Sequence, residues 1–218
     1  MAAGPRPQPS TREEDALWAS GYTRVAGVDE VGMGPLAGPV FTAAVILDPA
    51  RAHGRKRYRW LSEVNDSKVM LAPDRERLAE VIKTECLSYA IAWSTVAEID
   101  ALNIRQANFL AMRRAVASLG IKADHILIDG PWPIAYPLPQ KSIVDGDALV
   151  ASIAAASIVA KVARDAFMCH VSRFFPEWRF HEHKGYSTPE HLAALERLGP
   201  CAAHRRTFMP VLQASFVF

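Results

Sequence analysis

The chain has 218 residues, half of them hydrophobic and 22% of them charged, with a formal net charge of +2. This balance predicts a single folded domain with its own core and excludes a disordered chain. Because the net charge is close to zero, it gives no evidence for a nucleic-acid partner, and such evidence must come from local clusters of charge.

Strands and helices are expected to alternate along the chain. Residues 24–28 and 41–47 are apolar and β-branched, and a short loop rich in glycine and proline separates them, which predicts two antiparallel strands. Further strands are expected at residues 88–96, 125–128 and 141–144, and helices at residues 72–86, 99–119, 149–174 and 189–198. These elements define an α/β fold in which helices flank a mixed five-stranded sheet, with a C-terminal helical extension.

The domain boundaries follow from the same pattern. Residues 1–20 are expected to form a flexible N-terminal tail, residues 21–210 the folded domain and residues 211–218 a C-terminal tail. Residues 51–59 carry five Lys or Arg side chains and no acid. This basic loop is expected either to contact the backbone of a nucleic-acid duplex or to be a solvated surface, and the sequence leaves both open.

Cysteine usage and apolar runs indicate the cellular environment. Cys86, Cys169 and Cys201 are far apart and form no C-x-x-C pair, which excludes a disulfide framework and a four-cysteine zinc site. The longest apolar run, residues 151–160, is shorter than the ~20 residues that span a bilayer. Residues 1–15 contain no apolar stretch of the kind found in secretion signals. We therefore expect a cytoplasmic protein without a membrane partner. We also expect a monomer.

Four carboxylates stand where strands or loops are expected to end: Asp29, Glu30, Asp129 and Asp147. Neighbours on a regular strand point to opposite faces, so Asp29 and Glu30 can serve one site only if the strand ends or bulges there. Gathered carboxylates repel one another, and Mg²⁺ or Mn²⁺ would neutralise them because these ions prefer oxygen ligands. Alternatively, Asp147 caps a helix and Asp129 opens a turn with Gly130. Spacing alone does not decide between the two.

Longer segments resemble a known family. Residues 26–40, AGVDEVGMGPLAGPV, resemble the signature of ribonuclease HII, and further similar segments follow in the family's order at residues 65–68, 128–130, 146–147, 152–165, 183–186 and 204–208. The resemblance covers about residues 24–210 and implies a ribonuclease H-like fold. It also implies an endonuclease that cuts the RNA strand of RNA–DNA hybrids and duplex DNA with embedded ribonucleotides. The implied cut lies 5′ to the ribonucleotide and leaves 3′-hydroxyl and 5′-phosphate ends.

The resemblance also implies roles for individual residues. The site of Asp29, Glu30, Asp129 and Asp147 would hold two Mn²⁺ or Mg²⁺ ions. The backbone of Gly32, Met33 and Gly34 would contact the ribose 2′-hydroxyl, which distinguishes RNA from DNA. Tyr186 would pack beside the next sugar. Lys68, Lys161 and Lys184 would contact phosphates, although isolated lysines are more often solvated surface.

Two residues differ from the family pattern. Met33 stands where the family usually has arginine, which removes a cation expected to face the substrate backbone. Asp145, where the family often has lysine, places another acid next to the metal site. Both changes weaken the attraction for phosphate. Recognition of a single ribonucleotide is therefore the part of the family's function that they affect most.

The C-terminus suggests a protein partner. Residues 213–218, QASFVF, resemble the glutamine-plus-hydrophobic peptides by which bacterial replication and repair proteins dock on the sliding clamp. An extended tail would place Phe216 and Phe218 in an apolar pocket while Gln213 makes polar contacts. Alternatively, both phenylalanines fold back onto the protein's own surface. A zinc site is not indicated, because His183, His191 and His204 with Cys201 match no standard ligand spacing.

Overall fold

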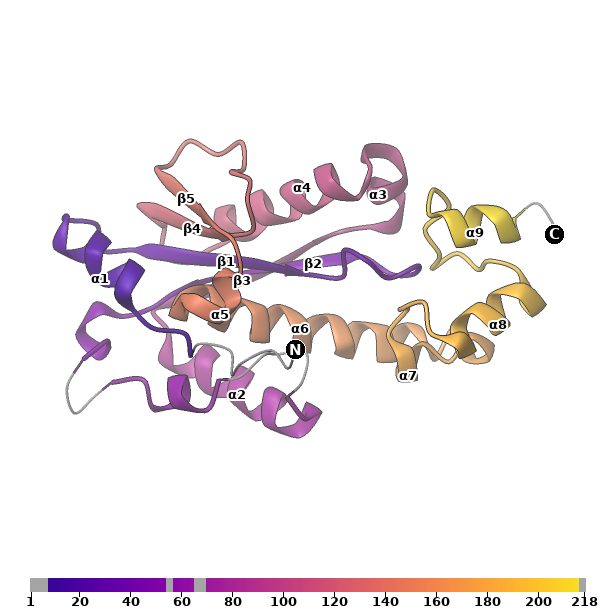
Figure 1. The fold of residues 1–218 in the computed structure, drawn as a ribbon, viewed down its shortest axis with the longest axis horizontal. Helices are drawn as coiled ribbons and strands as arrows, with labels where there is room; N and C mark the ends of the chain where they lie inside the picture. The colour runs from indigo at the N-terminus through magenta and orange to yellow at the C-terminus, as the bar shows by residue number, and fades with distance from the viewer. Residues whose placement is uncertain (1–7, 54–56, 65–69, 216–218) are drawn as a thin grey trace, which may run out of the picture.

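A five-stranded sheet in the order β3-β2-β1-β4-β5 forms the centre of the molecule (Figure 1). The computed structural model describes residues 8–53, 57–64 and 70–215. The strands are β1 (Val25–Val31), β2 (Val40–Ile46), β3 (Ser88–Ser94), β4 (His125–Asp129) and β5 (Gln140–Ile143). β2 pairs antiparallel with β1 and β3, whereas β4 pairs parallel with β1 and β5. The predicted mixed sheet and its antiparallel first pair are confirmed.

Helices cover both faces of the sheet. α6 (Ala151–Val171) and α2 (Ala72–Glu85) pack on one face, where they meet Ala43 and Val45 of β2. α4 (Ile104–Ala117) packs on the other face, against Ala44 and Ile46. Because both faces are buried, every residue of β2 is apolar or small, and the strand shows no alternation of apolar and polar residues.

Short helices surround this core. They are α1 (Arg12–Ala19), α3 (Val96–Leu102), α5 (Gly146–Leu149), α7 (Phe180–His183), α8 (Pro189–Leu198) and α9 (Met209–Ala214), with 3-10 turns at Pro49–Arg51, Arg59–Ser62 and Pro176–Trp178. α7, α8 and α9 gather at one end of the molecule and form the predicted C-terminal extension (Figure 1). Within the described ranges, no helix is long and apolar enough to cross a membrane.

Helix α6 lies directly against β1. The alanines and serines of its first half leave room for this approach, as expected from the sequence. A Cβ atom on Gly27 of β1 would lie 2.2 Å from the carbonyl carbon of Ser152 and 2.4 Å from the backbone nitrogen of Ile153. Only glycine therefore fits at position 27.

Two predicted helices differ in the structure. Residues 99–119 do not form one helix, because Asn103 adopts a left-handed conformation with φ 69° between α3 and α4. Its side chain accepts hydrogen bonds from the backbone nitrogens of Arg105 and Gln106, so it caps α4. The helix predicted at residues 149–174 is also divided, because Val150 is extended between α5 and α6.

The prediction of a flexible tail over residues 1–20 is wrong from residue 8 onward. Ser10 forms a β-bridge with Val150, and residues 12–19 form α1. Glu14 of α1 is fully buried, and its carboxylate accepts a hydrogen bond of 2.7 Å from the backbone nitrogen of Ser152. A carboxylate there satisfies an unpaired N–H in the first turn of α6 and interacts favourably with the helix dipole.

The predicted boundary at residue 211 is also wrong. Val211 lies on α9, is fully buried and packs with Leu36 and Leu195. The chain therefore belongs to the folded domain through the end of α9. Gln213 is exposed on this helix, whereas Phe216 and Phe218 lie outside the described residues.

Candidate active site

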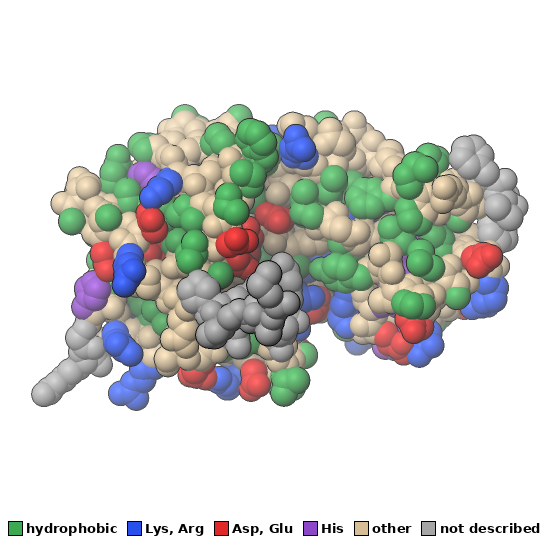
Figure 2. Space-filling model, viewed as in Figure 1, with side chains coloured by type: hydrophobic (Ala, Val, Ile, Leu, Met, Phe, Trp, Pro, Cys, Tyr) green, Lys and Arg blue, Asp and Glu red, His purple; other side chains and the backbone are tan. Residues whose placement is uncertain are grey.

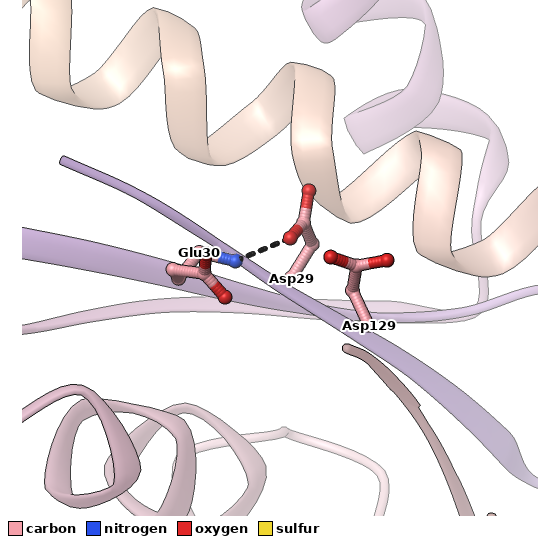
Figure 3. A group of neighbouring side chains, drawn as sticks. All are labelled: Asp29, Glu30 and Asp129. Atoms are coloured by element: carbon pink, nitrogen blue, oxygen red, sulfur yellow. Dashed lines mark hydrogen bonds between the residues drawn. The ribbon is translucent and has the colours of Figure 1, made fainter. Parts of the chain in front are cut away.

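Three of the four predicted carboxylates meet at the end of β4. One carboxylate oxygen each from Asp29, Glu30 and Asp129 lies within 4.8 Å of the other two (Figure 3). Asp29 is buried, and the other two are half-buried. We call these three residues the carboxylate group.

The register of the sheet explains how adjacent residues on β1 reach one site. Asp29 and Glu30 pair regularly with β2, so β1 neither ends nor bulges there, and that expectation was wrong. On the other edge of β1, pairing with β4 stops at Val28 and Ile128. Asp29 and Glu30 leave opposite sides of β1 beyond this last pair, and Asp129 lies beside them (Figure 3). The end of β4, and not a distortion of β1, creates the shared site.

Asp147 lies next to the carboxylate group but is not one of its three members. The backbone nitrogens of Gly146 and Asp147 lie 2.7 and 3.4 Å from Oδ1 of Asp129 and donate to it. Asp129 therefore caps α5, the helix that carries Asp147. The alternative in which Asp147 caps the following helix is wrong. Asp147 lies within α5, and the residue that precedes α6 is Val150, whose side chain forms no capping hydrogen bond.

The carboxylate group resists full ionisation. Burial raises the pKa of Asp29 well above its ordinary value, and the charges of Glu30 and Asp129 add to this effect, whereas a hydrogen bond with Ser157 opposes it. Burial, followed by the charge of Asp147, also raises the pKa of Asp129. A divalent cation would remove this repulsion, and carboxylate oxygens are the ligands that Mg²⁺ and Mn²⁺ prefer. The donor set therefore fits such an ion.

The glycine loop, residues 32–34, follows β1 directly. Gly32 has φ 98°, and a Cβ atom on it would lie 2.3 Å from Nε of Arg164, so a side chain is excluded. The half-buried Met33 side chain packs against a cluster that includes Val40 and Ile99. Part of this side chain stays exposed, so the expectation that side chain 33 faces the substrate stays a prediction. Gly34 is exposed and has open space where a Cβ would lie.

Two fully buried arginines hold the backbone between the glycine loop and Pro39, and sequence analysis assigned them no role. Arg164 and Arg205 have no exposed surface. Arg164 donates to the carbonyl oxygens of Ala37, Pro39 and Lys184, and Arg205 to those of Gly32, Met33 and Gly38, at 2.6 to 3.1 Å. Burial lowers the pKa of both, that of Arg205 to about 9. In the sequence, only the position of both arginines in segments that resemble the family could have indicated this role, because the carbonyls that they contact are distant along the chain.

Tyr186 packs against Arg164, whose guanidinium donates to the carbonyl oxygens of Ala37 and Pro39. The residue is 37% exposed, and Nζ of Lys161 and Cζ of Arg164 each lie 5.6 Å from the ring centroid. Such cations are attracted to an aromatic face.

The predicted lysines have different surroundings. Lys161 forms an ion pair of 2.8 Å with Asp165, and Lys184 donates to the carbonyl oxygen of His181. Both line a cavity of about 390 Å³ together with Tyr186. Lys68 lies outside the described residues. In the basic loop, Arg51 pairs with Glu85 at 3.0 Å, and residues 54–56 are not described.

Charge is distributed unevenly over the surface. Figure 2 shows acidic side chains near the middle of one face, whereas most of the Lys and Arg side chains visible there lie toward its lower half. Phosphate is repelled by acids unless a cation is bound between them. The positive side chains on the same face suit a polyanion that also meets a metal ion.

A ribonuclease H-like sheet with gathered carboxylates beside a glycine loop defines a class, the metal-dependent nucleases. Residues 26–211 match the family model of Ribonuclease HII. A Ribonuclease HII from Desulfitobacterium hafniense (strain Y51) is 49% identical over 202 residues, which cover 93% of this chain and 75% of that protein. The chain therefore belongs to the ribonuclease HII family. It is an endonuclease for RNA in RNA–DNA hybrids that depends on Mg²⁺ or Mn²⁺.

Solved structures agree with this assignment. Ribonuclease H2 from Pyrococcus horikoshii OT3 matches with a TM-score of 0.72 and 25% identity, over 89% of this chain and 98% of that one. A structure of the PCNA:RNase HII complex from Archaeoglobus fulgidus matches with a TM-score of 0.69 and 24% identity, over 85% and 95%. The second comparison shows the fold alone.

Proposed function

We propose that the chain cuts duplex DNA on the 5′ side of an embedded ribonucleotide, as well as RNA–DNA hybrids, and leaves 3′-hydroxyl and 5′-phosphate ends. The observation that carries this proposal is the position of the glycine loop, which directly follows β1, the strand that carries Asp29 and Glu30. A nucleotide that contacts the loop would place its phosphate near the carboxylate group. Recognition of the sugar and cleavage of the adjoining bond are thereby coupled.

The carboxylate group would hold two divalent ions, with Asp147 joining from α5. When bound, the ions supply an activated water and stabilise the leaving 3′-oxygen. Asp129 is oriented for this role because the Gly146 backbone nitrogen donates to one of its oxygens at 2.7 Å. Asp29 is fixed on the α6 side, where its Oδ1 accepts a hydrogen bond of 2.7 Å from the backbone nitrogen of Glu30.

Arg205 provides a physical reason for ribose recognition by the loop. It donates to the carbonyl oxygens of Gly32 and Met33. In a trans peptide the N–H of the next residue points opposite to the carbonyl. The N–H groups of Met33 and Gly34 therefore point away from Arg205, and the bound guanidinium strengthens them as donors. Two such donors suit a 2′-hydroxyl, and this arrangement does not depend on which side chain residue 33 carries.

Tyr186 would pack beside the next sugar, because its ring lies against Arg164, which also donates to the carbonyl oxygen of Ala37, three residues after the glycine loop. Lys161 and Lys184 would contact phosphates. A phosphate has to compete with Asp165 for Lys161, so this contact is weaker than one from an unpaired lysine. The 2′-hydroxyl is bound as a recognition group and is not the nucleophile.

End analysis of the products tests this function. The protein is incubated with Mg²⁺ or Mn²⁺ and three labelled substrates: a DNA duplex with one ribonucleotide, an RNA–DNA hybrid and an all-DNA duplex. We expect the first two to be cut, with the ribonucleotide at the 5′ end of the downstream fragment and a 3′-hydroxyl that a polymerase can extend. A cyclic phosphate product would refute the proposal, because it requires the 2′-hydroxyl as nucleophile. A cut 3′ to the ribonucleotide would also refute it, because the phosphate that is cut would then lie on the other side of the recognised sugar.

A sliding-clamp contact is proposed separately for residues 213–218. Gln213 is exposed on α9, while Val211 anchors that helix in the core. The archaeal structure with PCNA concerns a relative of the same fold. We expect Gln213→Ala and deletion of residues 216–218 to weaken binding to the organism's own clamp without changing the melting temperature. A lowered melting temperature on deletion would instead show that the phenylalanines pack on the protein.

A further inference from the structure

Three histidines are grouped in the C-terminal extension beside Tyr186. His191 of α8 and His204 are 0% and 1% exposed. The rings of His183 and His191 stack with centroids 4.3 Å apart, and Phe180 packs against His191 and His204. These are the histidines whose spacing indicates no zinc site, and the metal mechanism does not use them.

Hydrogen bonds connect two of these rings, those of His204 and His191, in one direction. The backbone nitrogen of Cys201 donates to Nδ1 of His204 at 3.1 Å. Nε2 of His204 lies 3.0 Å from Nε2 of His191, and Nδ1 of His191 lies 2.8 Å from the carbonyl oxygen of Tyr186. We call this series from Cys201 to Tyr186 the histidine chain.

The two ends of the histidine chain fix its protons. A backbone N–H can only donate, so Nδ1 of His204 carries no proton and its Nε2 does. His191 must then accept at Nε2 and carry its proton on Nδ1, which donates to the Tyr186 carbonyl, a group that can only accept. Both requirements agree, so each ring is neutral and has one tautomer.

Protonation of either ring would break the histidine chain. A second proton on His204 would face the Cys201 N–H, and one on His191 would face the proton of His204. The charged or titratable groups around them do not favour protonation: His183 faces both rings, and Arg206 and the Cys201 thiol face His204. Burial lowers the pKa of His191 to about 4 and that of His204 to about 3.

The histidine chain ends at a backbone segment that needs support. Lys184 and Gly185, which precede Tyr186, both have left-handed φ values, 52° and 83°. A left-handed conformation at a residue with a side chain costs on the order of 1 kcal/mol or more. Three successive carbonyls are held from different parts of the fold. Lys184 accepts from Arg164, Gly185 from the backbone of Leu36, and Tyr186 from His191 and the backbone of Thr188.

The other end of the histidine chain belongs to the segment that holds the glycine loop. His204 forms an antiparallel bridge with Ala37, in which the backbone nitrogen of Arg205 donates to Leu36 and that of Gly38 to Ala203. Arg205, the next residue, donates to Gly32. The histidine chain therefore spans the two segments proposed to face the ribonucleotide.

We propose that His204 and His191 are positioning residues that act through Tyr186. The histidine chain fixes the Tyr186 carbonyl, and thereby the ring, at a set place relative to the glycine loop. The inference rests on the proposed function of Tyr186 beside the sugar. Neither histidine touches the substrate, so their loss changes how well a ribonucleotide is held and leaves the binding of metal by the carboxylate group unchanged.

Two substitutions of His191 separate positioning from packing. The side-chain nitrogen of asparagine can replace Nδ1 and keep the bond to Tyr186, whereas glutamine can replace Nε2 and keeps only the bond to His204. We expect His191→Gln to raise KM for a duplex with one ribonucleotide about five- to tenfold, with kcat nearly unchanged, because one hydrogen bond is lost. His191→Asn should stay within about twofold. A purely structural role predicts the reverse order, because glutamine fills the space of histidine better than asparagine does.

A double-mutant cycle tests whether His191 acts through Tyr186. In a Tyr186→Ala background, the KM penalty of His191→Gln should disappear. A penalty that is unchanged there, or equal KM values for the two His191 variants, would overturn the proposal.

Ring tautomers in the wild-type protein give a test that needs neither a variant nor a substrate. Long-range ¹H–¹⁵N NMR at pH 7 should show the proton of His191 on Nδ1 and that of His204 on Nε2. Any other protonation pattern would overturn the proposal even if every variant failed to fold. Because this measurement contains no nucleic acid, its result is independent of whether the enzyme cuts at single ribonucleotides.

Discussion

Gly27→Ala places a methyl group between β1 and α6, where the structure leaves no room. The new Cβ would lie 2.2 Å from the carbonyl carbon of Ser152 and 2.4 Å from both the backbone nitrogen of Ile153 and Oγ of Ser152. Two of these contacts are with backbone, which cannot rotate away. The start of α6 must therefore move, although Glu14 holds it through the Ser152 nitrogen. Overpacking costs about 1–3 kcal/mol, and we expect a loss near 3 kcal/mol.

Thermal and urea denaturation measure this loss. For a chain of this size, about 3 kcal/mol corresponds to a melting temperature lowered by roughly 6–12 °C. Activity should fall as well, because Asp29 lies two residues from Gly27 and contacts Ser157 of α6. Gly120→Ala is the matched control: its Cβ would meet only Oγ of Ser88, at 3.8 Å, and its φ is not left-handed. A Gly27→Ala variant that melts within 2 °C of this control, on the order of half a kcal/mol, would refute the packing argument.

Three further predictions concern the supports of the site. Glu14→Ala should lower the unfolding free energy by about 1–2 kcal/mol, and Glu14→Gln, which keeps an acceptor, by less; equal losses in urea denaturation would exclude capping as the cause. Arg205→Met leaves three carbonyls without this donor and should lower the unfolding free energy, measured by urea denaturation, by at least about 3 kcal/mol. The exposed control Arg206→Met should change it by less than about 0.5 kcal/mol. His204 has a folded pKa, about 3, below the ~6.5 of an unfolded chain. The folded state therefore binds this proton less well, and stability from the neutral ring is lost as pH falls below about 6.5. The stability difference between wild type and His204→Gln should shrink from pH 7 to pH 4, and a constant difference would contradict this.

Local signals in the sequence predicted the sheet well. The apolar runs of β1 and β2 and the short loop between them fixed two antiparallel strands, and the small residues of α6 predicted a close approach. Carboxylates at strand ends, together with the family-like segments, identified all three members of the carboxylate group. These features depend on residues that are close together in the chain, so their pattern is visible without coordinates.

Long-range contacts were not predictable in the same way. Glu14 accepts a hydrogen bond from the backbone nitrogen of Ser152, 138 residues away. Nothing in the sequence near Glu14 distinguishes it from the acids of an exposed helix. Arg205 donates to backbone carbonyl oxygens, which every residue has, so the sequence does not indicate which residues it contacts. The route by which Asp29 and Glu30 share a site depends on where β4 ends relative to β1, and only the register of the pairing reveals this.

Manganese binding measured together with cleavage tests the central claim most directly. Calorimetric titration of the wild type with Mn²⁺ should show saturable binding, and Asp29→Asn should weaken it by at least about tenfold and abolish cleavage of an RNA–DNA hybrid. Without metal, the same variant should be more stable than the wild type, because it removes a buried charge that Glu30 and Asp129 repel. The exposed control Glu196→Gln should match the wild type in all three measurements. An Asp29→Asn protein that binds Mn²⁺ and cuts the hybrid as the wild type does would contradict the account.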